Sequence, residues 1–147
     1  MNGIEILLVE DNARDAELTV RALKKHNLAN NLYIAKDGAE ALDFLLCKGK
    51  YAKRDLTNLP KVVFLDLKLP KVSGLEVLKT IKGDKRISKI PVVIVTSSSE
   101  EPDVKEAYRL GANSYVLKPL DFEKFMTAIS KLGYYWLVVN HPYKLRK

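Results

Sequence analysis

Several residues whose side chains could do chemistry stand where short apolar runs of this 147-residue chain end. They are the acids Glu10, Asp11 and Asp66, the hydroxyl of Thr96 and the amine of Lys118. If the runs are parallel strands, their carboxyl ends meet at one edge of a sheet, which is where open α/β sheets bind ligands. The positions therefore predict one pocket that holds three carboxylates, one hydroxyl and one ammonium.

A pocket of this composition suits phosphoryl transfer. Three carboxylates repel one another, which raises their pKa values unless the charge is neutralised. A hard divalent cation removes the conflict, and oxygen ligands with retained waters suit Mg²⁺. Aspartate is a known phosphoryl-accepting nucleophile, and the transfer mainly requires positioning and charge neutralisation. Because its charge is costly directly after the apolar run 62–65, we interpret Asp66 as the residue that accepts the phosphoryl group.

The elements that would position these residues alternate between apolar runs and segments of helical period. The expected strands are 4–9, 32–35, 62–65, 92–95 and 115–117. Three of these runs are continuously apolar, as strands buried on both faces of a parallel sheet are. The expected helices are 14–26, 38–47, 75–82, 101–110 and 121–137, each with apolar residues on one face. This order, β-α repeated five times, predicts an α/β fold with a parallel sheet and right-handed crossovers.

Helix-start signals agree with this order. Asp37 with Glu40, and Ser73 with Glu76, have the spacing of a capping box. Pro102 suits the first turn of the fourth helix, where its missing N–H costs nothing. The capping residues therefore place helix starts directly after three of the expected strands or their loops.

Four sequence motifs occur in order along the chain, each at the end of an expected strand: ILLVEDN, VVFLDLKLPKVSG, IPVVIVTSS and GANSYVLKP. Each motif alone is a weak signal, but the four in this order are specific. They resemble the receiver domain of two-component response regulators, of the chemotaxis-regulator type, over about residues 3–132. The resemblance implies one domain over residues 1–147, with an aromatic and basic extension at 133–147. It also implies a doubly wound, flavodoxin-like (βα)5 fold whose five-stranded parallel sheet has the strand order 2-1-3-4-5.

The resemblance implies a metal site around the phosphoacceptor. Asp66 matches the phosphoacceptor itself, and Asp11 matches a direct metal ligand. Glu10 matches the neighbouring acid, which usually acts through metal-bound water. Lys68 matches the position whose backbone carbonyl completes the metal shell, while Asp66 also contributes to it. The implied cofactor is Mg²⁺.

The resemblance also implies a switch. Lys118 matches the ammonium that pairs with Asp66 and then with phosphate. Thr96 matches the hydroxyl that moves to the phosphoryl oxygens, and Tyr115 matches the aromatic residue that turns inward when Thr96 moves. Pro119 matches a proline that is usually preceded by a cis peptide bond.

The implied function is that of a stand-alone response regulator rather than an enzyme with a separate substrate, because the residues after 132 are too few for an output domain. Its phosphoryl donor would be a histidine kinase. The basic stretch 48–61 and the aromatic segment after the last helix resemble regulators that partner phytochrome-type kinases, although single-domain regulators of other kinases share this pattern. The resemblance further suggests a homodimer through the face of the fourth helix, fifth strand and fifth helix.

Composition limits the other partners. The net charge is +7, and residues 48–61 carry four of these charges. A basic stripe can bind nucleic acid or an acidic protein. Because the chain has no DNA-reading motif and no array of basic residues interleaved with aromatic ones, we expect no nucleic-acid partner. No run approaches the length of a membrane span, the N-terminus lacks the basic region of a signal peptide, and Cys47 is the only cysteine. These features predict a cytoplasmic protein that is not bound to membranes.

Other function classes fit less well. A phosphatase of the haloacid dehalogenase type uses a similar aspartate but needs a second acid two residues later, where this chain has Lys68. Rossmann and P-loop nucleotide-binding proteins are excluded because no GxG or GxxxxGK[ST] occurs. A flavodoxin-like electron carrier would share the fold, but three acids are the wrong lining for a flavin phosphate. A receiver-fold interaction module that acts without phosphorylation stays open as the alternative.

Overall fold

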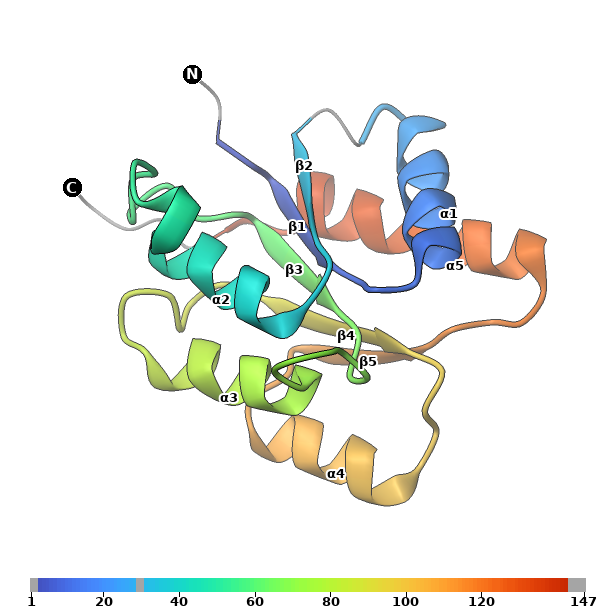
Figure 1. Cartoon of the computed structure of the whole chain (residues 1–147). Coiled ribbons are helices and arrows are strands. Elements are labelled where there is room, and N and C mark those ends of the chain that lie inside the picture. The colour runs from blue at the N-terminus through green and yellow to red at the C-terminus, as the bar shows by residue number, and fades with distance from the viewer. Residues whose placement is uncertain (1–2, 29–30, 143–147) are drawn as a thin grey trace.

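The computed structural model describes residues 3–28 and 31–142, in which strands and helices alternate five times (Figure 1). The strands are β1 Ile6–Val9, β2 Leu32–Ala35, β3 Val62–Leu65, β4 Val92–Thr96 and β5 Ser114–Leu117. The helices are α1 Ala13–Lys24, α2 Gly38–Leu46, α3 Gly74–Gly83, α4 Glu101–Arg109 and α5 Phe122–Tyr134. All ten elements expected from the sequence are therefore present, and none of the described helices is long and apolar enough to cross a membrane.

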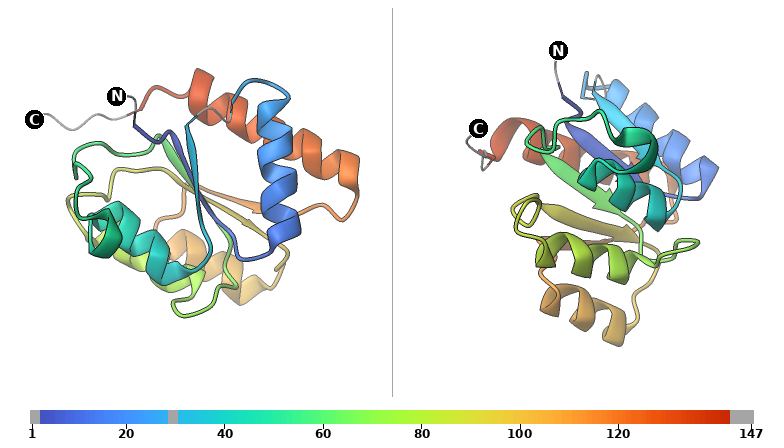
Figure 2. Two further views of the ribbon diagram at one scale, coloured as in Figure 1. Left: turned by 45° about the horizontal axis from the view of Figure 1, so that its top comes forward. Right: turned by 60° about the vertical axis from the view of Figure 1, so that its left-hand side comes forward.

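The five strands form one parallel sheet in the order β2-β1-β3-β4-β5, which confirms the predicted doubly wound topology. Helices α1 and α5 cover one face of the sheet, and α2, α3 and α4 cover the other (Figures 1 and 2). The order reverses between β1 and β3, because the chain runs from β1 to β2 on one side and then crosses to β3 on the other. In such folds the crevice at this reversal is the usual ligand site.

The central strands are buried on both faces, as their continuous apolar runs predicted. In β1, Leu7 and Val9 belong to the core under α2, α3 and α4, whereas Ile6 and Leu8 belong to the core under α1 and α5. The residues of β3 divide between the two cores in the same way. Burial on both faces holds β1 and β3 in place between the two helix layers. It therefore also holds the residues that follow these strands at the edge of the sheet.

Both predicted N-cap residues bond to the backbone of their helices. The side chain of Asp37 accepts a hydrogen bond from the backbone N–H of Glu40 at 2.7 Å, at the start of α2. The hydroxyl of Ser73 accepts one from the backbone N–H of Glu76 at 3.3 Å, at the start of α3. Pro102 lies in the first turn of α4, as expected.

The basic stretch 48–61 is anchored to the fold rather than only solvated. It contains a 3-10 turn at Gly49–Tyr51, and the Tyr51 hydroxyl donates a hydrogen bond to the Glu40 carboxylate at 2.7 Å. The Arg54 guanidinium lies 3.8 Å from the centre of the Phe44 ring, in cation–π contact. The stretch is therefore held against α2, while the side chains of its lysines at positions 48, 50 and 53 face solvent.

The last helix ends earlier than the sequence predicted. The α-helical part of α5 ends at Tyr134, and a π-helical turn, Tyr135–Val139, follows it. Trp136 and Leu137 of this turn pack against the core under α1 and α5, whereas Val138 and Val139 are more than half exposed. The aromatic segment after α5 therefore packs in part against its own domain. Residues 143–147 of the predicted extension lie outside the described residues.

One expectation about the backbone is wrong. The described part of the chain contains no cis peptide bond, so the bond between Lys118 and Pro119 is trans. The two isomers of an X-Pro bond differ by only about 0.5–1 kcal/mol, so residue types alone do not fix the isomer.

Candidate functional site

The predicted acids meet at the carboxyl edge of the sheet, at the crevice between β1 and β3. Val9 and Leu65 are partners in the parallel pairing, so Glu10 and Asp66, the residues that follow them, lie side by side. Carboxylate oxygens of Glu10, Asp11 and Asp66 all lie within 4.8 Å of one another. Glu10 and Asp66 are buried, and Asp11 is exposed at the mouth of the crevice.

This acidic cluster, Glu10, Asp11 and Asp66, fits a hard divalent cation. Its donors are all carboxylate oxygens, and the exposure of Asp11 leaves room for metal-bound water, which Mg²⁺ retains readily. The backbone N–H of Lys68 donates a long hydrogen bond of 3.4 Å to Asp66 Oδ1, and the Lys68 side chain points to solvent. The role predicted for the Lys68 carbonyl stays a prediction.

Lys118 reaches from the end of β5 into the same crevice. Its ammonium donates hydrogen bonds to Glu10 Oε1 at 2.7 Å, Asp15 Oδ2 at 2.8 Å and Asp66 Oδ2 at 2.9 Å. Only 9% of its side chain is exposed. Burial alone would lower the pKa of Lys118, but the bonds to Asp15, Glu10 and Asp66 outweigh it and raise the pKa, so the amine is charged.

The two buried acids differ in their tendency to ionise. Burial raises the pKa of Glu10 to about 7, although its hydrogen bond with Lys118 counteracts part of this effect. Burial acts on Asp66 in the same direction, but hydrogen bonds from Lys118 and Thr96 outweigh it and hold the pKa of Asp66 below its usual value. Asp66 is therefore the acid that stays ionised, which is the form that a nucleophile requires.

Thr96 and Tyr115 meet through the loop between β4 and α4. Thr96 is fully buried, and its hydroxyl accepts a long hydrogen bond of 3.4 Å from the backbone N–H of Ser98. The Tyr115 hydroxyl donates to the Ser98 carbonyl at 2.7 Å, and the Ser98 hydroxyl donates to Asp103 Oδ2 at 2.5 Å. Ser98 thus links the threonine at the site to the tyrosine on β5 and to the first turn of α4.

The structure therefore brings together the residues that the strand ends predicted, and it adds Asp15 and Ser98. Asp15 lies in the first turn of α1, which begins directly after the loop that carries Asp11. No signal in the sequence indicated that the Asp15 side chain would reach Lys118. The sequence placed Ser98 in the serine run after Thr96 but gave no sign that it would contact Tyr115.

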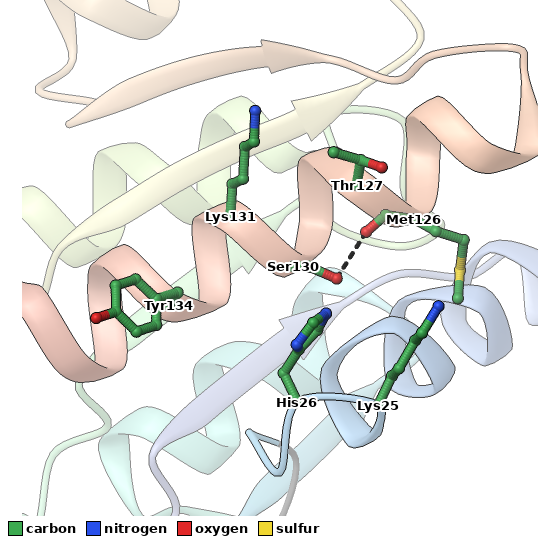
Figure 3. A pocket seen from close by; sticks show the side chains of 7 residues that line it. All are labelled: Lys25, His26, Met126, Thr127, Ser130, Lys131 and Tyr134. Carbon is green, nitrogen blue, oxygen red and sulfur yellow. Dashed lines mark hydrogen bonds between the residues drawn. The ribbon is translucent and has the colours of Figure 1, made fainter.

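A second hollow lies away from the sheet edge, between the end of α1 and α5 (Figure 3). It has a volume of about 400 Å³ and is lined by Lys25, His26, Met126, Thr127, Ser130, Lys131 and Tyr134. The Ser130 hydroxyl already donates to the Met126 carbonyl at 2.8 Å, and the two lysines are exposed residues whose amines lie apart from each other (Figure 3). This hollow contains no converging groups comparable to those beside Lys118, so the carboxyl edge is the candidate site.

Comparison with known proteins agrees with this geometry. The family model described as the response regulator receiver domain matches residues 6–130. Among sequence relatives, the probable methanogenesis regulatory protein FilR2 of Methanothrix harundinacea is 41% identical over 135 residues. That alignment covers 92% of this chain and 84% of FilR2.

Two solved structures match almost the whole chain. The Mn(2+)-bound form of response regulator Rcp1, a protein of Synechocystis sp., superimposes with a TM-score of 0.87 at 35% identity over 94% of this chain and 97% of Rcp1. The phosphorylated cyanobacterial phytochrome response regulator RcpA superimposes with a TM-score of 0.88 at 33% identity over 95% of this chain and 98% of RcpA. The acidic cluster and Lys118 both lie within the part of the chain that the family model covers.

Proposed function

Because the chain belongs to the response regulator receiver domain family, we propose that it works as a stand-alone response regulator that accepts a phosphoryl group on Asp66 from a histidine kinase. The observation that carries the proposal is the convergence of the acidic cluster with the ammonium of Lys118 at the β1–β3 crevice. In this proposal residues 1–147 act as one receiver domain, which catalyses only its own phosphorylation and dephosphorylation.

The transfer follows from the charges at the crevice. An oxygen of ionised Asp66 attacks the phosphorus atom in line, the bond between phosphorus and the histidine nitrogen of the kinase breaks, and the imidazole leaves with the electron pair. Lys118 then pairs with the phosphoryl oxygens. Asp11, Asp66, the Lys68 carbonyl and, through water, Glu10 would hold Mg²⁺, which supplies positive charge beside those oxygens. The Mn(2+)-bound form of Rcp1 and the phosphorylated RcpA support this assignment.

The proposed signal is a shift between two arrangements of the β4–α4 loop. The phosphoryl group favours the active arrangement only to the extent that it binds Thr96 and Lys118 better there. Tyr115 would report that shift, because its hydroxyl is bonded to the Ser98 carbonyl, two residues after Thr96. The shift of the loop and of Tyr115 would change the conformation of the face formed by α4, β5 and α5.

The proposed partners are a cytoplasmic histidine kinase and a second copy of this chain. RcpA is a phytochrome response regulator, which supports a phytochrome-type kinase, and the anchored basic stretch 48–61 agrees with that branch. The homodimer would use the face of α4, β5 and α5. There Tyr108, Leu117, Leu120 and Phe122 are exposed apolar residues, and Leu120 is fully exposed.

A small phosphodonor tests the proposal without the kinase. Purified protein is incubated with acetyl phosphate with and without Mg²⁺, and the phosphorylated form is separated on Phos-tag gels. We expect a retarded band that requires Mg²⁺ and disappears in Asp66→Asn. A protein that never gives this band, with either acetyl phosphate or phosphoramidate, would instead favour the interaction module that acts without phosphorylation.

A further inference from the structure

Lys118 has one partner that does not belong to the acidic cluster. Its ammonium has three N–H groups, and each has a carboxylate acceptor: Glu10, Asp66 and Asp15. Glu10 and Asp66 lie in the cluster that would hold the metal, whereas Asp15 comes from the first turn of α1. The three acceptors are thus supplied by three different parts of the crevice wall.

We propose that Asp15 is a positioning residue that holds the Lys118 ammonium over the crevice while the other two acceptors change partners during phosphorylation. The inference rests on the proposed function. When Asp66 carries a phosphoryl group and Glu10 faces the metal, Asp15 is the one carboxylate of the three that binds neither the metal nor the phosphoryl group. A lysine side chain is long and loses much rotamer freedom when it is fixed, so a permanent acceptor is needed to keep it in place.

Helix α1 holds Asp15 in the required position. The Asn12 side chain accepts a hydrogen bond from the backbone N–H of Asp15 at 2.9 Å, and the Thr19 hydroxyl donates to the Asp15 carbonyl at 2.8 Å. Asp15 is the third residue of the helix, where the helix dipole favours a negative charge. Its side chain is mostly buried, with 27% exposed, so the ion pair with Lys118 is shielded from much of the solvent.

Both partners of the ion pair are therefore fixed before phosphorylation. The backbone N–H of Lys118 donates to the Thr96 carbonyl at 2.7 Å, which fixes the start of its side chain, and Asp15 fixes the end. Without Asp15 the ammonium would lose its attachment to α1 and would sample positions away from Asp66. We therefore expect slower phosphoryl transfer, because Lys118 would neutralise the incoming phosphoryl oxygens less often.

The kinetic test uses a double-mutant cycle. Asp15→Asn should slow phosphorylation by acetyl phosphate at saturating Mg²⁺ about tenfold, the scale typical of residues that orient a site's ligands. Asp15→Glu, which keeps the charge, should recover part of the rate. In a Lys118→Met background, Asp15→Asn should change the rate by less than about twofold, because the two residues act as a unit. Equal slowing in both backgrounds would overturn the inference.

The matched control is Glu17→Gln. Glu17 lies on the same helix, its side chain is 69% exposed, and it pairs with Arg21 rather than with Lys118. This substitution also removes one negative charge from α1, so a general loss of attraction for Mg²⁺ would appear in both variants. We expect Glu17→Gln to phosphorylate at the wild-type rate. Slowing equal to that of Asp15→Asn would contradict the positioning role.

A spectroscopic readout separates this inference from the proposed function. NMR of the lysine ammonium groups should show a slowly exchanging Nζ signal that is missing in Lys118→Met. The signal should be lost in Asp15→Ala and retained in Glu17→Gln. If wild-type protein never becomes phosphorylated but the signal depends on Asp15, the proposed function fails and the ion pair stands. If wild-type and Asp15→Asn proteins phosphorylate at the same rate and share the signal, the inference alone fails.

Discussion

At the scale of single residues, the site is governed by the cost of burying charge. Glu10 and Asp66 lie side by side and share one ammonium, yet burial raises the pKa of Glu10 to about 7 while hydrogen bonds hold that of Asp66 low. Lys118 lowers the pKa of both acids, but burial outweighs it at Glu10, whereas Thr96 lowers the pKa of Asp66 further. A buried acid with a raised pKa destabilises the fold at neutral pH unless a cation neutralises it.

The raised pKa of Glu10 gives a prediction about stability. In the unfolded chain Glu10 loses its proton near pH 4.5, and in the folded chain near pH 7. The folded state therefore binds more protons between these values, and its stability falls as pH rises through this window. Glu10→Gln does not titrate, so without metal it should be more stable than the wild type by about 2 kcal/mol at pH 8, with a much smaller gain at pH 5.

Urea unfolding of both proteins at pH 5 and pH 8, in the presence of a chelator, measures this difference. The same gain at both pH values would show that Glu10 does not titrate between them. Adding Mg²⁺ at pH 8 should stabilise the wild type more than Glu10→Gln, because the ion binds only the folded state.

Thr96 gives a second prediction at this scale. Thr96→Ala should phosphorylate at nearly the wild-type rate, because Lys118 and the acidic cluster remain in place. Its Tyr115 should no longer respond to phosphorylation, because the hydroxyl that would pull on the β4–α4 loop is missing. Ring resonances of Tyr115 measured with and without beryllofluoride test this, and Thr96→Ser is the control that keeps the hydroxyl. A wild-type Tyr115 response in Thr96→Ala would mean that Thr96 is not the switch.

Residue identity predicted the acidic cluster and Lys118 because strand ends of a parallel sheet must converge. It did not predict the Asp15 contact, because the reach of a side chain from the first turn of a helix depends on how that helix lies against the sheet. The trans bond before Pro119 was also missed, since the sequence allows either isomer. The predictable contacts are thus those imposed by the sheet, and the others depend on helix packing and loop conformation.

At the scale of elements, the loop between β3 and α3 holds Asp66 in place. The backbone N–H of Gly74 donates to the Leu67 carbonyl at 2.9 Å, which closes the loop directly behind Asp66. A Cβ atom at Gly74 would lie 2.2 Å from the Asp66 carbonyl oxygen and 2.5 Å from the Leu67 Cα atom. Only glycine fits this approach, so the Ser-Gly pair after the strand is part of the site's support.

Gly74→Ala should therefore destabilise the protein by about 1–3 kcal/mol, the usual cost of overpacking, and should slow phosphorylation by displacing Asp66. Gly83→Ala is the matched control in the same helix, because a Cβ atom there would meet nothing within 4 Å. We expect that control to be neutral or to gain up to about 1 kcal/mol. Thermal unfolding and Phos-tag rates distinguish the two. A Gly74→Ala protein as stable and as reactive as the wild type would contradict the close approach.

The elements were also predictable to different degrees. Strands β2 and β3 have the predicted bounds, because short apolar runs without interruption have clear ends. The end of α5 was misplaced, because the aromatic and apolar segment after Tyr134 has no polar residue to mark where the helical period stops. Periodicity indicates which elements exist, whereas the end of a helix depends on the tertiary contacts of its last turn.

At the scale of the whole molecule, the proposed function requires phosphorylation at the crevice to alter the neighbouring face of α4, β5 and α5. Strand β5 is one of the two edge strands of the sheet, and it links Tyr115 to Lys118 at the site. Leu117 at the end of β5 and Phe122 at the start of α5 are each nearly half exposed, and Leu120 between them is fully exposed. An apolar surface beside Lys118, the residue proposed to pair with the phosphoryl group, is well placed to change its partner when the site is occupied.

We therefore predict a homodimer on the face of α4, β5 and α5 that beryllofluoride and Mg²⁺ strengthen. Light scattering should give an increased average mass when both are added, and Leu120→Asp should remain a monomer, because a charge in a closing apolar contact must lose its water. Val138→Asp adds the same charge to an exposed position of the π-helical turn and should still dimerise, which separates this face from the C-terminal segment. A wild-type protein that stays monomeric at high concentration, with and without beryllofluoride, would remove the dimer from the mechanism and leave the surface around Leu120 for a different protein partner.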